Sequence, residues 1–168
     1  IKAGKTTSIY AGSGKGKTTL ADILIKLYVK KNYTGTIKFD DQDIEELNPI
    51  YLRNQIAYIT QDTYLFDETV RFNLIFSSET SKDDEIIKYI KLFDLNNIFD
   101  DNKIDLNKQI ISGGSNISGG QKQRLLIIRE LIKNPKLIIF DEGLSSLENK
   151  NKLKILNEVR NLLPSVTI

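Results

Sequence analysis

A glycine-rich octapeptide near the start of the chain has the residue types and spacing of a phosphate-binding loop. Residues 11–18 read Ala-Gly-Ser-Gly-Lys-Gly-Lys-Thr and depart from that pattern only at Ala11, where the pattern has glycine. Glycines let successive backbone N–H groups face one point, and a following helix adds its positive end there. A triphosphate fits that point, and we expect Lys17 to reach its outer phosphates and the Thr18 hydroxyl to bind Mg²⁺. The predicted nucleotide-binding residues are Gly12, Ser13, Gly14, Lys15, Gly16, Lys17, Thr18 and Thr19.

Two carboxylates follow an apolar run later in the chain. Residues 137–140 are Leu-Ile-Ile-Phe and lead directly into Asp141 and Glu142. Charges at the end of a buried strand need partners, and a Mg²⁺ with an attacking water would supply them. We expect Asp141 to support the metal and Glu142 to orient or deprotonate the water. Alone, the acids fit a helix cap equally well and the glycines fit a flexible turn, but their occurrence together favours nucleotide hydrolysis.

A second glycine cluster precedes another expected helix. Residues 117–121 read Ile-Ser-Gly-Gly-Gln, followed by Lys122-Gln123-Arg124. A helix N-terminus with bare N–H groups and a serine hydroxyl suits anionic oxygens, although an ordinary helix cap has a similar composition.

Alternating strands and helices must position these clusters. We expect short strands over residues 6–11, 36–39 and 56–60, a fully buried strand over 137–140, and a last strand starting at residue 165. We expect one helix with an apolar face at Leu20, Ile23, Leu24 and Leu27, and a second with Ile86, Ile90 and Phe93, which follows a capping box from Ser81 to Asp84. A third expected helix has its apolar face at Leu125, Ile128 and Ile132, and a fourth covers residues 152–163. This order predicts an α/β fold with a mostly parallel sheet covered on both faces, and ligands at the carboxyl ends of the strands.

Composition narrows the class of protein. A length of 168 residues suits one domain, and the longest apolar runs are too short to span a membrane. The net charge of +2 contains no block of one sign, so we expect no nucleic-acid partner. Cysteine is absent, which excludes disulfides and thiolate metal sites. The chain begins at Ile1 without a secretion signal, so we expect a domain excised from a longer cytoplasmic-side protein.

The Ser118-Gly119-Gly120-Gln121 cluster resembles the signature sequence of ABC transporter ATP-binding domains, and the order of the other motifs resembles that family across the chain. Gln61 is similar to the Q-loop glutamine, and residues 145–148 resemble the D-loop, with Glu148 where the family usually has aspartate. Residues 64–74 resemble a stretch found in exporters, including peptide and bacteriocin exporters.

The resemblance implies a P-loop NTPase (RecA-like) core over residues 1–66 and 118–168, with a helical subdomain over 67–117. It implies that two cassettes pair head to tail, with the signature acting in trans, and that Gln61 senses Mg²⁺ and the γ-phosphate. It also implies that residues 62–76 contact a transmembrane domain, fused or separate, at the cytoplasmic face of what is expected to be a bacterial membrane. ATP hydrolysis would then power export, with Lys17, Gln61 and Glu142 catalytic and Thr18, Gln61 and Asp141 at the metal.

Three departures from the family concern activity. Only ten residues precede Ala11, and Tyr10 is a poor substitute for the aromatic residue that stacks on adenine. The chain contains no histidine, so the γ-phosphate sensor is missing, and residues 111–116 lack the glutamate that many exporters carry before the signature. We therefore expect this chain to bind nucleotide weakly and to turn it over slowly or not at all.

Other functions remain open at this point. A non-transport ABC ATPase of the DNA-repair or translation-factor type would carry larger inserts than the modest stretch between Gln61 and Ser118. A small-molecule kinase leaves the second glycine cluster unexplained. A regulatory or scaffold domain would not need Lys17 and Glu142.

Overall fold

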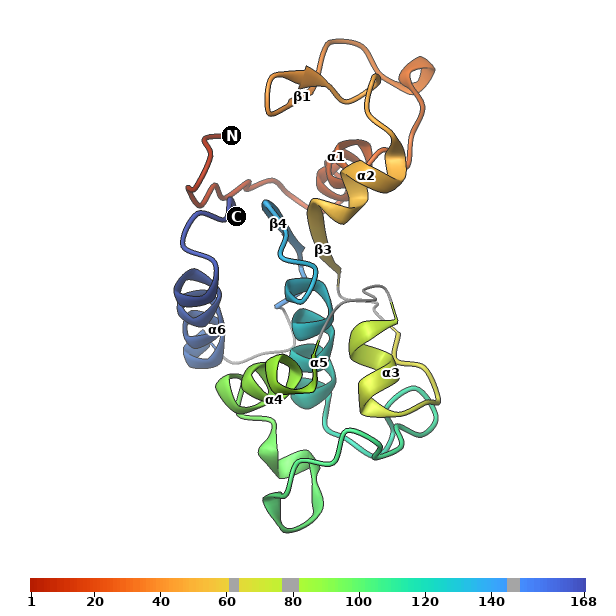
Figure 1. Cartoon of the computed structure of the whole chain (residues 1–168). Coiled ribbons are helices and arrows are strands. Elements are labelled where there is room, and N and C mark those ends of the chain that lie inside the picture. Colours follow the sequence, from red (N-terminus) through yellow and green to blue (C-terminus); the bar gives the residue numbers. More distant parts are fainter. Residues whose placement is uncertain (61–63, 77–81, 145–148) are drawn as a thin grey trace.

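Helices and two short sheets make up the computed structural model, which describes residues 1–60, 64–76, 82–144 and 149–168 (Figure 1). The helices in these ranges are α1 (Lys17–Leu24), α2 (Pro49–Asn54), α3 (Val70–Ile75), α4 (Asp83–Leu92), α5 (Gly119–Leu131) and α6 (Asn149–Leu162). The 3₁₀ helices are η1 (Lys30–Asn32), η2 (Asn96–Ile98) and η3 (Asp100–Asn102), and the strands are β1 (Lys38–Phe39), β2 (Gln42–Asp43), β3 (Ile56–Thr60) and β4 (Leu137–Asp141). Within the described part of the chain, no helix has the length and apolar character needed to cross a bilayer.

A parallel strand pair lies at the centre of the fold. β3 and β4 run side by side in register from Ile56 opposite Leu137 to Thr60 opposite Asp141. Their carboxyl ends therefore lie together at one edge, as predicted. α5 packs on β3, and α1 contacts β4, so different helices cover the pair (Figure 1).

The main core lies between this strand pair and the helices α3 to α6. All six residues predicted for the α4 and α5 apolar faces are buried: Ile86, Ile90, Phe93, Leu125, Ile128 and Ile132. A smaller core lies beside α2 and is formed by Ile25, Ile44, Leu52 and Ile56. The helical spacing of apolar residues in the sequence thus correctly predicted the buried faces of α4 and α5.

The first two predicted strands differ from the structure. Residues 6–11 form no strand, because a cavity separates them from β4 and leaves their backbone without a neighbouring ladder; within this segment Thr7 N–H donates to Ile168 O at 2.7 Å. The strand predicted over 36–39 is shortened to β1. It pairs with β2 in an antiparallel hairpin whose turn residues, Asp40 and Asp41, both have positive φ.

Four further predictions need correction. β4 is not fully buried: Ile138 is buried, but its neighbours are half-exposed beside two cavities. Leu20 of α1 lines one of these cavities and is exposed, Leu27 lies beyond the end of α1 and is also exposed, and Ala21 is the residue buried in that helix. The N-cap of α4 is Lys82, which makes no side-chain cap, and Ser81 lies outside the described residues. The last predicted strand is reduced to a bridge between Leu137 and Thr167.

Candidate functional site

The loop before α1 has the backbone shape that its glycines suggest. Gly14 and Gly16 have φ values of 71° and 80°, in the left-handed region that a side chain rarely adopts. Gly16 is the N-cap of α1 and offers no side-chain cap, so the first N–H groups of the helix stay open. The first turn carries no acidic residue that would repel an anion. These features fit a phosphate group, as the sequence predicts.

Lys17 folds back onto this loop. Its Nζ donates to the carbonyl oxygens of Ala11 and Gly12 at 3.0 and 3.1 Å. Both bonds are exposed, so exchanging these neutral acceptors for phosphate oxygens costs little and gains charge-assisted hydrogen bonds. The Lys17 ammonium therefore lies at the loop that a phosphate would occupy.

The acidic pair meets the same region from the opposite side. A cavity of about 380 Å³ is lined by Lys17 and Leu20 of the loop and helix, by Asp141 at the end of β4, and by Glu142, which follows it. Glu142 is exposed with φ 54°, and it forms an antiparallel bridge with Thr60 at the end of β3. Carboxylate oxygens are ligands that Mg²⁺ prefers, so the chemistry of Asp141 suits a magnesium ion bound with nucleotide, whereas Thr18 is not among the residues that line this cavity.

A tyrosine in the middle of β3 contacts both α1, which follows the phosphate loop, and β4, which ends in Asp141. The Tyr58 hydroxyl lies 3.2 Å from Asp22 Oδ1 on α1 and 3.3 Å from Asp141 Oδ2 on β4. Burial, and then the charges of Asp22 and Asp141, raise the pKa of Tyr58, so its hydroxyl keeps its proton at neutral pH. Sequence reasoning missed Tyr58 and Asp22. The available signal was a phenol within a buried strand, because such a hydroxyl needs a partner.

The second glycine cluster caps α5. Ser118 Oγ accepts from Gln121 N at 3.2 Å, and Gln121 Oε1 accepts from Ser118 N at 2.7 Å, which is a complete capping box. The Ser118 hydroxyl still has its hydrogen to donate, because it acts here as an acceptor. Figure 1 places this end of α5 near α4 and the 3₁₀ helices η2 and η3, and Gln121 Nε2 donates to Asn97 Oδ1 at 3.1 Å, whereas the phosphate loop leads into α1 at the other end of the molecule. The chain therefore does not bring its signature to its own phosphate loop.

A buried arginine ties α5 to the segment after β3. Arg129 Nε donates to Asn73 O at 2.6 Å, its Nη1 to Tyr64 O at 2.8 Å, and its Nη2 to Asn73 Oδ1 at 2.9 Å. Burial lowers the pKa of Arg129 from its ordinary value, although Glu130 opposes this. Asn73 is itself fully buried, and its Nδ2 donates to the carbonyl oxygens of Phe66, Glu68 and Thr69. Sequence reasoning missed both residues.

Aromatic side chains cover this arginine on the outside. Phe66 packs edge-on against Tyr64, Phe72 and Phe76, with ring centroids 4.9 to 5.8 Å apart. The Arg129 guanidinium lies 5.3 Å from the Phe76 ring and 5.6 Å from the Phe66 ring. Tyr64, Phe72 and Phe76 are exposed, and we call these four rings the aromatic patch.

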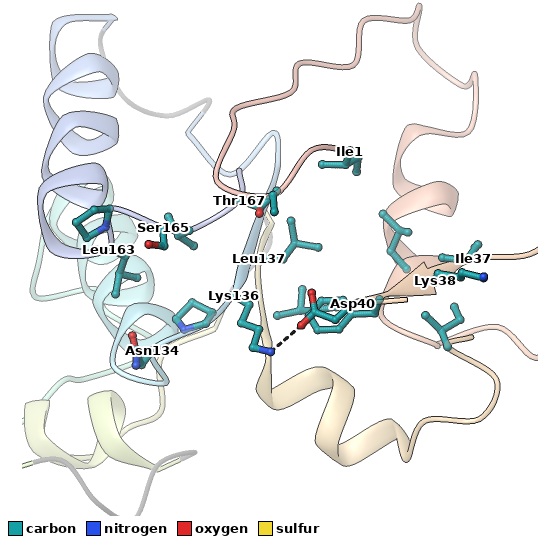
Figure 2. A pocket seen from close by; sticks show the side chains of 18 of the residues that line it. Ile1, Ile37, Lys38, Asp40, Asn134, Lys136, Leu137, Leu163, Ser165 and Thr167 are labelled. Carbon is teal, nitrogen blue, oxygen red and sulfur yellow. Dashed lines mark hydrogen bonds and ion pairs between the residues drawn. The ribbon is translucent and has the colours of Figure 1, made fainter. Parts of the chain in front are cut away.

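A larger cavity, of about 670 Å³, lies elsewhere (Figure 2). Apolar residues from the hairpin region and from both ends of the chain line it, including Ile37, Leu137 and Leu163. Its charged lining residues are Lys38 and the ion pair of Lys136 with Asp40, at 2.7 Å. Neither the phosphate loop nor Glu142 reaches this cavity, so the smaller cavity at Lys17 is the better candidate site.

Two predicted positions lie outside the described residues: Gln61 and residues 145–148. The structure brings Lys17, Asp141 and Glu142 around one cavity and places Ser118, Gly119, Gly120 and Gln121 apart from them. The division into a core and a helical subdomain over 67–117, and the role of each site residue, stay predictions.

Comparison with protein families gives a match over most of the chain. The family model described as ABC transporter matches residues 1–145. The chain belongs to the ABC transporter family. It also resembles the solved structure of a bacterial Atm1-family ABC exporter with ATP bound, with a TM-score of 0.81 and 29% identity over 93% of this chain. The P-loop NTPase fold predicted from the sequence is therefore confirmed.

Curated relatives of this ABC transporter chain are exporters and a flippase. The microcin-J25 export ATP-binding/permease protein McjD of Escherichia coli is 37% identical over 98% of the chain. The ATP-dependent lipid A-core flippase of Francisella tularensis is 35% identical over 99%. The chain spans 28% and 27% of the lengths of these two proteins, so it corresponds to about a quarter of each.

Proposed function

We propose that this chain is the ATP-binding and ATP-hydrolysing part of an ABC exporter. The observation that carries the proposal is the shared cavity, which Lys17 enters from the phosphate loop and Asp141 and Glu142 enter from β4. Family membership and the exporter names of the relatives support it. They do not support a DNA-repair or translation-factor ATPase, which was the main alternative.

Each side chain has a distinct role in this proposal. Lys17 and the open N–H groups of α1 bind the phosphates, while Thr18 and Asp141 hold Mg²⁺. When bound, Mg²⁺ neutralises charge on the phosphate oxygens. Glu142 holds the attacking water and accepts its proton. We assign Gln61 to the metal and the γ-phosphate from the family resemblance.

The proposal includes two partners. Because Ser118 lies apart from the phosphate loop of its own chain, we propose that Ser118, Gly119, Gly120 and Gln121 contact a nucleotide held by a second copy, arranged head to tail. Three rings of the aromatic patch are exposed and Arg129 contacts two of the four, and we propose that the patch contacts a transmembrane domain at the cytoplasmic face of a membrane. The two named relatives carry different cargoes, a microcin and lipid A-core, so the cargo is not assigned.

The test is calorimetric binding of ATP with Mg²⁺. Lys17→Ala removes the ammonium at the loop, so we expect affinity to fall at least tenfold, about 1.4 kcal/mol or more. Lys31→Ala, which removes an exposed ammonium on η1, is the matched control and should bind as the unaltered chain does. Equal affinity in the Lys17 variant and the unaltered chain would overturn the proposal.

Turnover by this chain is expected to be slow. Tyr10 is 92% exposed and is not packed to support a stacked adenine ring, so we expect ATP to be held loosely. Phosphate release should therefore stay below about 0.1 per second, well under the ordinary range for enzymes of roughly 1 to 1,000 per second. Release within that range would contradict this expectation while leaving the binding proposal intact.

A further inference from the structure

The Tyr58 hydroxyl lies between two carboxylates that belong to different elements. Asp22 is on α1, five residues beyond Lys17, and Asp141 ends β4. The hydroxyl oxygen is 3.2 Å from the first carboxylate and 3.3 Å from the second, so the geometry favours neither acceptor. All three side chains are half-buried, which limits how far water can replace these contacts.

One hydroxyl carries one hydrogen, so Tyr58 donates to one carboxylate at a time. The carboxylate without that hydrogen faces the hydroxyl oxygen, and this contact is unfavourable unless another donor or a cation satisfies it. Asp22 and Asp141 therefore compete for a single hydrogen bond. A cation or another donor that binds one of the two carboxylates therefore shifts the Tyr58 hydroxyl toward the other carboxylate.

We propose that Tyr58 is a positioning residue that holds the Asp141 carboxylate in the orientation needed to bind Mg²⁺, with Asp22 as the competing acceptor. The inference rests on the proposed function, because Mg²⁺ bound with nucleotide is what engages Asp141. The hydroxyl fixes the carboxylate through Oδ2 and leaves the other oxygen, Oδ1, for the metal or its water. Tyr58 also links β3 to α1, so the acidic edge and the phosphate-loop helix are connected through one side chain.

The readout is a ratio of two affinities measured by calorimetry. The affinity for ATP with Mg²⁺ is divided by the affinity for ATP with the metal removed by EDTA, and we call this the metal ratio. Tyr58→Phe removes the hydroxyl and keeps the ring, so Asp141 and Asp22 both lose this donor, while the residues of the phosphate loop itself are unchanged. We expect the metal ratio to fall about three- to tenfold, the effect of losing one ordinary hydrogen bond, because the hydroxyl is shared between two carboxylates.

Tyr33→Phe is the matched control. It removes a hydroxyl that donates to the Glu45 carboxylate near the β1–β2 hairpin, and Tyr33 does not line the candidate site. Its metal ratio should equal that of the unaltered chain. The melting temperature of each variant without nucleotide shows whether a loss of stability, rather than a misplaced carboxylate, explains a change.

A second variant keeps the inference testable if Tyr58→Phe does not fold. Asp22→Asn removes the competing charge, so Tyr58 should donate to Asp141 more of the time and the metal ratio should stay level or rise. A ratio below that of the unaltered chain in Asp22→Asn, or an unchanged ratio in Tyr58→Phe, would overturn the inference. If either result is found while ATP binding still depends on Lys17, the proposed function is retained and only the role of Tyr58 is rejected. No nucleotide binding by the unaltered chain overturns both.

Discussion

Replacing Arg129 by methionine is expected to lower the free energy of unfolding by about 3 kcal/mol or more. Methionine fills a similar length of the buried site but donates no hydrogen bonds. The carbonyl oxygens of Asn73 and Tyr64 and the Asn73 Oδ1 each lose their Arg129 donor. Asn73 Oδ1 keeps the Phe66 N–H as a donor, but the two carbonyl oxygens lose the Arg129 bonds, and each buried polar atom left without a partner costs about 1–3 kcal/mol. Urea unfolding followed by far-UV circular dichroism measures this change.

Arg129→Lys is the matched variant for this experiment. Lysine keeps the positive charge but lacks the planar fork that reaches three acceptors at once. We expect its loss of stability to lie between those of the unaltered chain and the methionine variant. Hydrogen exchange should rise at residues 64–76 in both variants, because this segment is held to α5 by the arginine. A loss below about 1 kcal/mol in Arg129→Met would show that the network contributes little.

The consequence for function follows from what Arg129 connects. Its backbone belongs to α5, whose first residues form the predicted signature, and its side chain supports the aromatic patch. If the patch contacts a transmembrane domain, a displacement there reaches the signature helix through this side chain. Exposed rings alone would transmit less, because they contribute packing area but no directional bonds.

Local sequence patterns predicted the site residues that are close together along the chain. The phosphate loop is eight consecutive residues, and Asp141 and Glu142 follow an apolar run directly, so the types and their spacing are visible together. The link through Tyr58 joins residues 36 and 83 positions apart. The sequence does not indicate that Tyr58 lies close to Asp141 unless the register of the parallel pair β3 and β4 is already known.

The missed strand over residues 6–11 shows a second limit. The pattern of a strand was present, but a strand also needs a partner on which its backbone can bond, and here a cavity intervenes. Arg129 shows a third limit. It lies one turn after Leu125 on the buried face of α5, where a charged residue is rare. That position indicates a buried hydrogen-bond network, but it does not identify the acceptor. The partner Asn73, 56 residues earlier, has no such signal.

The glycine after the acidic pair gives the second large expected effect. A Cβ added at Gly143 would lie 2.3 Å from Ile59 O, 2.7 Å from Ile59 Cγ2 and 2.9 Å from Ile59 C. Real Cβ atoms essentially never come within 3.0 Å of a backbone atom, so the ends of β3 and β4 must separate in Gly143→Ala. We expect the free energy of unfolding to fall by about 1–3 kcal/mol, the usual cost of overpacking.

Gly119→Ala tests whether the effect comes from this contact rather than from the loss of a glycine. Gly119 opens α5, and a Cβ there meets nothing within 4 Å. Alanine is favoured over glycine in a helix by up to about 1 kcal/mol, so this control should be neutral or stabilising. Equal stability of Gly143→Ala and the unaltered chain would show that the strand ends adjust without cost.

The same substitution should also disturb the reacting end of the site. Glu142 directly precedes Gly143. The backbone bridge between Glu142 and Thr60 holds Glu142 at the end of β3. Separating the strand ends moves Glu142 away from the cavity that it shares with Lys17, whereas the phosphate loop itself is not displaced. Gly143→Ala should therefore retain most of its affinity for ATP in EDTA and lose hydrolysis. Parallel loss of both would instead indicate that the whole strand pair, and not its end alone, had been disrupted.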